Sequence, residues 1–270
     1  MKIGICGDTV KWKKIAEAGF DYAEANFSKV VSASDEDFDH YLEERRSAGI
    51  EIEAYNGFFG SGFCLYGDIR EDGSVALRLD SKLDEIREYA EKGFSRASKL
   101  GGKIAVFGSS KARDLRAGIT KEEAEEHVVR VLRICGDVAQ KYGMRVALEP
   151  LRRQEANFIN TVSEGLELCK RAAHPSVGLL VDLFHFYMNG EDIEDIKKAK
   201  DYIIHVHMAR PDPDRKYPTE ADIEPCRVWA ETLHSIGYDG RLSLECSFKD
   251  EFDIGLTKVK CVTDMFKYRG

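Results

Sequence analysis

Short runs rich in Val, Ile, Leu and Phe recur along this chain, and segments with helical periodicity lie between them. Runs that are apolar almost throughout fit a parallel sheet buried on both faces, and their alternation with helices is typical of an α/β fold. Eight such runs favour a closed barrel over an open doubly wound sheet, so we expect a (β/α)8 TIM barrel that forms a single domain over residues 1–270. The predicted strands are Lys2–Cys6, Tyr22–Ala25, Ile50–Tyr55, Lys103–Phe107, Arg145–Glu149, Val177–Asp182, Ile203–His207 and Leu242–Glu245.

The predicted helices end at glycines that precede the next strand. The clearest helix is Lys121–Tyr142, where Thr120 and Glu123 can form a capping box at the start and Gly143 stands where a C-terminal cap belongs. Further helices are predicted over residues 35–48, 82–100 and 223–236. Because a helix ends shortly before each of these strands, the chain reads as a series of repeated βα units, with no break in composition.

Composition argues against several classes of protein. The net charge of −8 argues against a nucleic-acid-binding surface. Seven scattered cysteines without a C-x-x-C pair predict reduced thiols in a cytoplasmic protein. Neither a signal peptide nor a membrane span is expected, because no apolar run approaches the roughly 18 residues that a span needs. No G-x-G-x-x-G loop follows the first predicted strand, which weakens a dinucleotide-binding interpretation.

Four of the predicted strands end on side chains that bind metals or move protons. These are Glu149, Asp182, His207 and Glu245, separated by 33, 25 and 38 residues. Side chains at the carboxyl ends of barrel strands converge on one mouth, where three buried carboxylates would repel one another unless a divalent cation lay between them. Three oxygen donors and one nitrogen suit Mn²⁺, Mg²⁺ or Co²⁺ better than a thiolate-rich zinc site does. His205 shares the face of His207 and is expected one layer deeper, as a hydrogen-bonded neighbour rather than a ligand.

Two long segments follow predicted strands and are expected at the same mouth. Asn56–Asp72 is rich in glycine and aromatic residues, and Met208–Asp222 is rich in proline and charge. Long loops at the carboxyl ends of barrel strands often act as lids or as substrate walls. We therefore predict that both segments border the site, although either is also compatible with an ordinary surface connection.

Several of these segments resemble one superfamily of enzymes. ALEPLRRQEANFINT, at residues 147–161, is similar to the fifth-strand region of the xylose-isomerase-like sugar isomerase/epimerase superfamily, which contains ketose 3-epimerases, inosose dehydratases and hydroxypyruvate isomerases. VDLFHF resembles its D-x-x-H motif, and HVH and SIGYDGRLSLE resemble its seventh and eighth strands. The resemblance is strongest over about residues 145–250. It implies a (β/α)8 barrel with Mn²⁺ as the expected metal, Mg²⁺, Co²⁺ or Zn²⁺ as alternatives, and as ligands Glu149, Asp182, His207 and Glu245.

The resemblance also implies individual roles. The first and last of the four ligands, Glu149 and Glu245, would form the acid/base pair that acts on opposite faces of the sugar. Glu155 matches a glutamate that positions the substrate or the base, and His185 matches a donor to a substrate oxygen. Arg215 matches a loop arginine that binds substrate oxygens, with Arg210 as a competitor for that role.

These features predict a divalent-metal-dependent sugar isomerase or epimerase that removes a proton alpha to the carbonyl of a ketose or related keto-sugar. The same proton abstraction begins a dehydration or elimination, so a lyase acting on a keto-sugar or keto-glycoside is the alternative. A non-catalytic binding subunit is less favoured, because the carboxylate set is complete. An apurinic endonuclease is disfavoured because the fourth predicted strand, KIAVFGSS, ends without the histidine that a three-zinc cluster would need. The expected partner is a small-molecule sugar, and a homo-oligomer is also an expectation.

Overall fold

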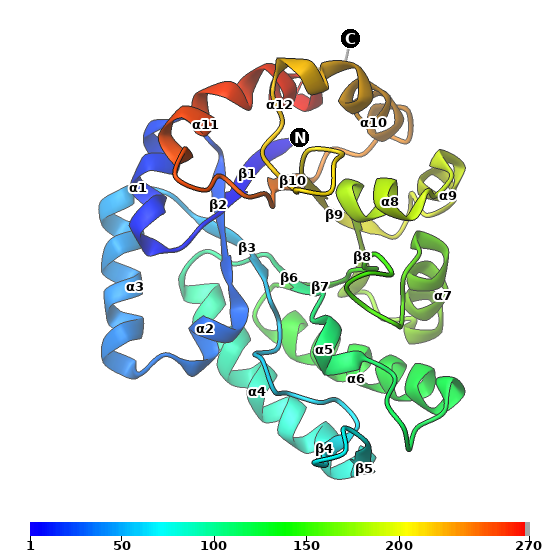
Figure 1. The fold of residues 1–270 in the computed structure, drawn as a ribbon. Helices are drawn as coiled ribbons and strands as arrows, with labels where there is room; N and C mark the ends of the chain where they lie inside the picture. The colour runs from blue at the N-terminus through cyan, green and yellow to red at the C-terminus, as the bar shows by residue number, and fades with distance from the viewer. Residues whose placement is uncertain (268–270) are drawn as a thin grey trace.

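The computed structural model describes residues 1–267, which fold into a closed barrel of eight parallel strands surrounded by helices (Figure 1). Around the barrel the strands follow one another in chain order, and pairing of the last strand with the first closes the ring. The strands are β1 (Lys2–Cys6), β2 (Tyr22–Asn26), β3 (Ile52–Asn56), β6 (Ile104–Phe107), β7 (Arg145–Leu148), β8 (Val177–Asp182), β9 (Ile203–Met208) and β10 (Arg241–Leu244). All eight predicted strands are present, and the predicted (β/α)8 barrel is confirmed.

The helices cover the outside of the barrel (Figure 1). The predicted capping box is confirmed, because the Thr120 hydroxyl accepts a hydrogen bond from the Glu123 amide at 3.2 Å and the Glu123 carboxylate accepts one from the Thr120 amide at 2.9 Å. The helices are α1 (Thr9–Glu17), α2 (Phe27–Ser32), α3 (Asp35–Ala48), α4 (Leu79–Lys99), α5 (Ser110–Arg113), α6 (Lys121–Lys141), α7 (Val162–Ala172), α8 (Leu183–Asn189), α9 (Ile193–Lys198), α10 (Ile223–Ser235), α11 (Phe252–Lys258) and α12 (Lys260–Lys267), with a 3₁₀ turn at Glu220–Asp222. None of the helices over residues 1–267 is long and apolar enough to span a bilayer.

A small hairpin outside the barrel was not predicted. β4 (Gly67–Ile69) and β5 (Val75–Leu77) pair antiparallel, partly within the segment that the sequence indicated as a loop. The turn between them depends on Asp72, whose carboxylate accepts the Ser74 amide at 2.9 Å. Strands of three residues are too short to show a period-two pattern, which is why the sequence did not reveal them.

The barrel interior holds a small apolar layer beneath the predicted site. Ile104, Val106, Ala147, Leu180 and Ile204 form a buried cluster separate from the larger core. Ala147 precedes Glu149 by two residues, and Leu180 precedes Asp182 by two. Because side chains alternate along a strand, those two carboxylates point to the same inner side as the apolar layer. The apolar layer therefore lies directly beneath the mouth of the barrel.

Candidate active site

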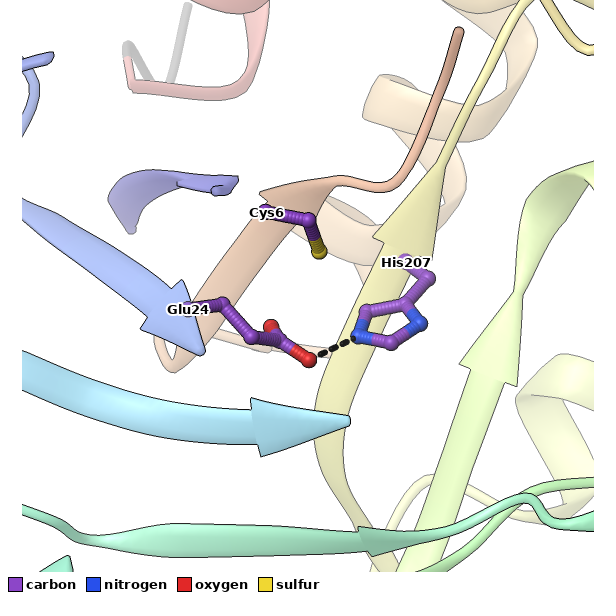
Figure 2. A group of neighbouring side chains, drawn as sticks. All are labelled: Cys6, Glu24 and His207. Carbon is purple, nitrogen blue, oxygen red and sulfur yellow. Dashed lines mark hydrogen bonds and ion pairs between the residues drawn. The ribbon is translucent and has the colours of Figure 1, made fainter. Parts of the chain in front are cut away.

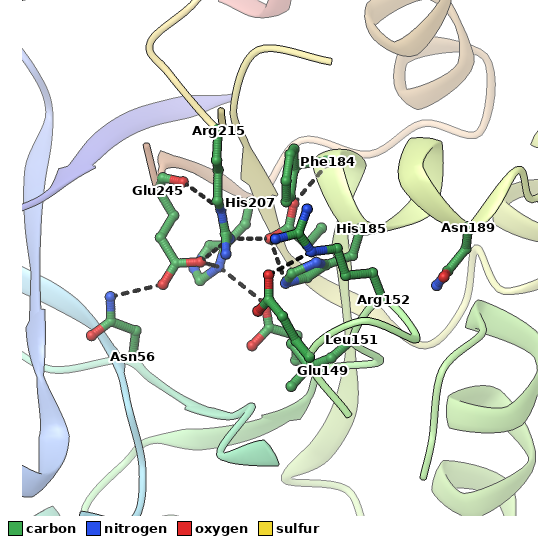
Figure 3. A network of polar contacts seen from close by, with 12 residues as sticks. Asn56, Glu149, Leu151, Arg152, Phe184, His185, Asn189, His207, Arg215 and Glu245 are labelled. Carbon is green, nitrogen blue, oxygen red and sulfur yellow. Dashed lines mark hydrogen bonds and ion pairs between the residues drawn. The ribbon is translucent and has the colours of Figure 1, made fainter. Parts of the chain in front are cut away.

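The four predicted ligands gather at the carboxyl-terminal mouth of the barrel. Asp182 ends β8 and His207 lies in β9, whereas Glu149 and Glu245 directly follow β7 and β10. One donor atom of each residue lies within 4.8 Å of the donor atoms of the other three. Nδ1 of His207 is 3.5 Å from Oε1 of Glu149 and 3.3 Å from Oε2 of Glu245 (Figure 3). The structure thus brings together every member of the predicted ligand set.

A carboxylate that the sequence patterns did not reveal holds both histidines of β9. Glu24, in the middle of β2, is fully buried and accepts a hydrogen bond from Nε2 of His205 at 3.0 Å. It also accepts one from Nε2 of His207 at 2.9 Å (Figure 2). Burial alone would raise the pKa of Glu24, but the imidazoles of His207 and His205 hold it at about 2, so this carboxylate stays ionised. A signal existed in the sequence, because a glutamate in the middle of a buried strand requires a polar partner.

The hydrogen bond to Glu24 decides which nitrogen of His207 faces the other ligands. Because Nε2 donates to Glu24, Nδ1 is the atom left to face Glu149 and Glu245. Among the residues described, the buried Nδ1 of His207 and Oε1 of Glu149 have no hydrogen-bond partner. Buried carboxylates that face one another are unfavourable, and either a proton on Nδ1 or a cation among these atoms offsets that cost. The four residues therefore fit a divalent cation with mixed oxygen and nitrogen ligands.

Burial and charge act differently on the ionisable groups of the mouth. Burial raises the pKa of Glu149, and the charge of Glu245 adds to the effect. Burial would also raise the pKa of Glu245, but the Arg215 guanidinium outweighs it and holds that pKa well below its usual range. For His207, burial lowers the pKa, whereas Glu24 and Glu245 together raise it well above its usual value. The mouth thus concentrates negative charge that attracts a proton or a metal cation, and the two compete for Nδ1.

Arg215 reaches Asp182 and Glu245 from the loop after β9. Its backbone has a positive φ of 48°, and its Nη2 lies 2.5 Å from Oδ2 of Asp182 and also bonds Oε2 of Glu245. Its Nε donates to the Glu245 carbonyl at 3.0 Å. Arg210, the competitor, pairs with two aspartates that lie between β9 and α10 instead. The loop over residues 208–222 therefore supplies a side chain to the mouth, and that side chain is Arg215.

His185 lies in the first turn of α8, next to Asp182. Its Nε2 is 3.5 Å from Oδ2 of Asp182, and the side chain is buried. Among the described residues, neither ring nitrogen has a hydrogen-bond partner. A buried imidazole that faces the mouth with both nitrogens unsatisfied can bind an oxygen of a ligand, which is consistent with the predicted role.

Glu155 lies further out than the other predicted residues. It is exposed, and its Oε1 accepts a hydrogen bond from Nε of Arg152 at 2.6 Å. Arg152 in turn lies over the Phe184 ring at 4.8 Å, and Arg215 lies 4.9 Å from the same ring. Arg152 is a further cation beside the mouth that the sequence patterns did not identify (Figure 3). Glu155 therefore connects to the site through Arg152 rather than by direct contact with the four ligands.

Asn56, the last residue of β3, contacts the site from the opposite side. Its Nδ2 donates to Oε1 of Glu245 at 3.1 Å (Figure 3). Asn56 and Glu24 also line a cavity of about 420 Å³ over the ends of β1, β2 and β3. The segment predicted to border the mouth over residues 56–72 thus does so with its first residue.

A second group of candidate donor atoms adjoins the first. Cys6, Glu24 and His207 each place a donor atom within 4.8 Å of the other two (Figure 2). The nitrogen that His207 turns toward this group already donates its proton to Glu24. Burial also raises the pKa of the Cys6 thiol well above its usual value, which keeps the sulfur protonated. The donor atoms of Glu149, Asp182, His207 and Glu245 therefore suit a cation better than those of this second group do.

The protein is a closed (β/α)8 barrel that carries three carboxylates and one imidazole at its mouth. The model of the xylose isomerase-like TIM barrel family matches residues 12–257, and the chain belongs to this family. The predicted resemblance is therefore confirmed.

Two relatives and one solved structure are similar to this chain. The chain is 31% identical over 144 residues to an inosose isomerase of Bacillus licheniformis, a match that covers 50% of this chain and 51% of the relative. The chain thus spans about half the length of that relative. It is 27% identical over 243 residues to a D-psicose 3-epimerase of Ruminiclostridium cellulolyticum, covering 86% and 76% of the two chains. A crystal structure of the IOLI protein with a bound zinc atom superposes with a TM-score of 0.74 at 21% identity and covers both chains fully.

Proposed function

We propose that this protein is an enzyme, a divalent-metal-dependent sugar isomerase or epimerase that removes a proton alpha to the carbonyl of a ketose or related keto-sugar. The observation that carries the proposal is that the Glu149 and Glu245 carboxylates lie 3.5 and 3.3 Å from the same nitrogen of His207. They come from the two ends of the four-strand arc β7 to β10. Two carboxylates that approach one point from different strands can supply both a base and an acid to a single carbon.

The proposed cation would be held by residues already grouped at the mouth. We propose Mn²⁺, with Mg²⁺, Co²⁺ or Zn²⁺ as alternatives, and as ligands Glu149, Asp182, His207 and Glu245. When bound, the ion would polarise a carbonyl oxygen and stabilise the negative charge that develops as the alpha proton leaves. The support is the donor set itself, three carboxylates and one imidazole, together with buried donor atoms that lack other partners.

The side chains of the protein would move the proton and orient the sugar. One of Glu149 and Glu245 removes the alpha proton, and the other returns a proton. Return to the opposite face of the same carbon is epimerisation, whereas return to the neighbouring carbon is aldose–ketose isomerisation. His185 and Arg215 would bind substrate oxygens, because both present nitrogen donors beside the ligands. Glu155 would position Arg152, to which it is hydrogen-bonded.

A lyase acting on a keto-sugar or keto-glycoside is the second candidate. It begins with the same proton abstraction and ends with loss of a substituent from the adjacent carbon. The observation that favours a lyase is the cavity of about 420 Å³ lined by Glu24 and by Asn56, the hydrogen-bond partner of Glu245, because this cavity has room for a leaving group. Product mass separates the two, since an isomerase conserves the mass of the substrate and a lyase releases water or an aglycone.

The cysteines and the site suggest a cellular compartment and a partner for the protein. All seven cysteines are free, which suits a reducing compartment, and we propose the cytoplasm. The proposed partner is a small-molecule sugar, with assembly into a homo-oligomer through the outer helices.

The direct test is turnover of a panel of ketoses and keto-sugars by protein loaded with Mn²⁺, by chelated protein and by reloaded protein. We expect turnover by the loaded protein, a loss of at least about 100-fold on chelation, and recovery on reloading. Absence of turnover on the whole panel by loaded protein, or full activity after complete removal of the metal, would contradict the proposal.

A further inference from the structure

A cavity of about 480 Å³ lies at the amino-terminal end of the barrel strands, and we call it the floor cavity. It is lined from the starts of four strands, by Lys103 directly before β6, Arg145 of β7, Ile203 of β9 and Arg241 of β10. All eight strands are parallel, so their starts gather at one end of the barrel and their carboxyl ends at the other. The floor cavity therefore lies at the end of the barrel opposite the mouth.

Apolar side chains separate the floor cavity from the proposed catalytic centre. Ile104 and Ile204 line the cavity and also belong to the buried apolar layer beneath the mouth. Glu149 and Asp182 lie on the other side of that layer, at the carboxyl ends of their strands. None of the four predicted metal ligands lines the floor cavity. A molecule bound in it would not touch the proposed catalytic centre.

Three cations that line the floor cavity lack a carboxylate partner. They are Lys103, Arg145 and Lys200, and none of their side chains forms an ion pair with any residue in the described range 1–267. Burial lowers the pKa of the Arg145 guanidinium, which is the direction expected for a cation that loses water without gaining a counter-ion. Like charges that share one cavity repel one another, so an anion bound among them would be stabilising.

The other charged groups around the floor cavity are paired and do not cancel this excess. Lys2 and Arg241 both bond the carboxylate of Glu53, and Asp239 accepts the amino terminus at 2.7 Å. With the three unpaired cations, six cations face two carboxylates, which is a net charge of +4 in a chain whose total is −8. Asp201 is exposed and does not line the cavity, and counting it still leaves +3. The floor is thus a positive region on an acidic protein.

A phosphate group matches this charge better than a carboxylate does. A phosphate monoester carries about −1.5 to −2 charges at pH 7 and three acceptor oxygens, whereas a carboxylate carries a single charge. The guanidinium of Arg145 can donate to two phosphate oxygens, and the ammonium groups of Lys103 and Lys200 act as point charges. Ile203 and Ile204 supply apolar surface for a carbon skeleton, and the volume lies in the range of roughly 300 to 1,000 Å³ that is usual for small-molecule sites.

We propose that the floor cavity is a binding site for a small organic phosphate monoester, and that Arg145, Lys103 and Lys200 bind its phosphate group. The bound molecule would be a ligand rather than a substrate, because it lies at the opposite end of the barrel from the proposed acid/base pair. The proposal does not depend on the proposed function.

The test is a calorimetric titration with glucitol 6-phosphate, a phosphate monoester without the carbonyl group of a ketose. Mn²⁺-loaded and chelated protein are titrated in parallel, so that binding through a metal at the mouth is recognised by its loss on chelation. We expect one equivalent to bind to both forms with the same Kd, and the affinity to fall as the salt concentration rises. Inorganic phosphate should bind more weakly than the ester, succinate at least about tenfold more weakly, and glucitol not detectably.

Two variants connect this binding to the floor cavity. Arg145→Gln and Lys103→Gln each remove a cation that has no ion pair in the described part of the chain, so we expect both proteins to fold and their affinity for glucitol 6-phosphate to fall at least about tenfold. Arg46→Gln and Lys92→Gln are the matched controls, because these exposed residues of α3 and α4 do not line the cavity. They remove the same charge and should keep the affinity of the unmodified protein. Circular dichroism and Tm establish that each variant is folded.

The outcomes are decisive for the floor cavity alone. Absence of binding by the ester, tighter binding of succinate, or an affinity that the two floor variants leave unchanged overturns the proposal. An equal loss of affinity in the floor variants and in their controls also overturns it, because the effect is then one of total charge. Binding that disappears on chelation places the ester at the mouth and overturns it as well. None of these results changes the outcome of the turnover test for the proposed function.

Discussion

The Glu24 carboxylate lies 2.9 Å from Nε2 of His207, across the barrel interior from β2 to β9. This contact turns Nδ1 of the same ring toward Glu149 and Glu245. His207 is the one nitrogen donor among the four predicted ligands. Carboxylates that orient a ligating histidine commonly affect metal affinity although they do not touch the metal. The position of the imidazole therefore depends on a residue outside the ligand set.

Replacement of Glu24 by Gln should weaken metal binding. The amide keeps the shape of the side chain but accepts a hydrogen bond from only one of His205 and His207, so His207 loses its fixed orientation. We expect Mn²⁺ affinity to fall about 10- to 100-fold, measured by calorimetric titration. Glu53→Gln is the matched control, because Glu53 is also a buried carboxylate but bonds Lys2 and Arg241. Equal loss of affinity in both variants would show that Glu24 acts only on general stability.

Metal binding should stabilise the fold through Asp182. At a free Mn²⁺ concentration of 100 times Kd, binding to the folded state contributes about 2.7 kcal/mol, which raises Tm by about 5 to 10 °C. In Asp182→Asn the Tm increase should fall to less than half, while the Oδ1 atom can still accept the Phe184 amide that it binds at 2.8 Å. Asp80→Asn, which changes an exposed carboxylate paired with Arg130, should keep the full increase. An undiminished increase in Asp182→Asn would remove Asp182 from the ligand set.

Arg113 should position the segment that carries Glu149. This fully buried arginine donates to the Phe107 carbonyl at 2.9 Å and to the Glu149 carbonyl at 2.6 Å. Arg113→Met leaves both carbonyls buried without these donors, so we expect a loss of about 3 kcal/mol in the free energy of unfolding. Arg116→Met, three residues further along and outside α5, removes one long hydrogen bond and should cost less than about 1 kcal/mol. Urea denaturation measures both, and similar losses would refute the positioning role.

A carboxyl group away from the site should make stability depend on pH. Burial raises the pKa of Glu191 to about 7, and its carboxylate accepts the Val162 amide at 2.7 Å. Because the folded state holds this proton more tightly than the unfolded state, the stabilising contribution is complete below about pH 4.5 and is lost as the pH rises through about 7. Glu191→Gln should therefore gain stability relative to the unmodified protein at pH 8 more than at pH 5. Denaturant titrations at both pH values check this, with the exposed Glu167→Gln as the control, which should show no such change.

The fold and the grouping of Glu149, Asp182, His207 and Glu245 at one mouth were predictable because their signals are local. Each strand is a short apolar run, and each predicted ligand stands at the end of such a run, as Asp182 does in β8. Barrel topology then brings those ends together without further information from the sequence.

The contacts that complete the site could not be predicted, because they depend on distances across the barrel. Glu24 and His207 are 183 residues apart and lie in strands that are not neighbours. Asn56 and Glu245 are 189 residues apart, and an asparagine at the end of a strand equally suits a turn. Glu155 was expected beside the substrate, and its place on Arg152 depends on how the loop after β7 folds over Phe184.

We propose above that Glu149 and Glu245 exchange a proton with the carbon alpha to a sugar carbonyl. The most direct measurement is NMR of a substrate ketose incubated in D₂O with Mn²⁺-loaded enzyme, with Glu245→Gln protein of equal metal content as the comparison. We expect deuterium to enter the alpha position at the rate of turnover or faster with the unmodified enzyme, and at least about 100-fold more slowly with the variant. Product that forms without deuterium at that carbon, or equal exchange by the two proteins, would contradict the account.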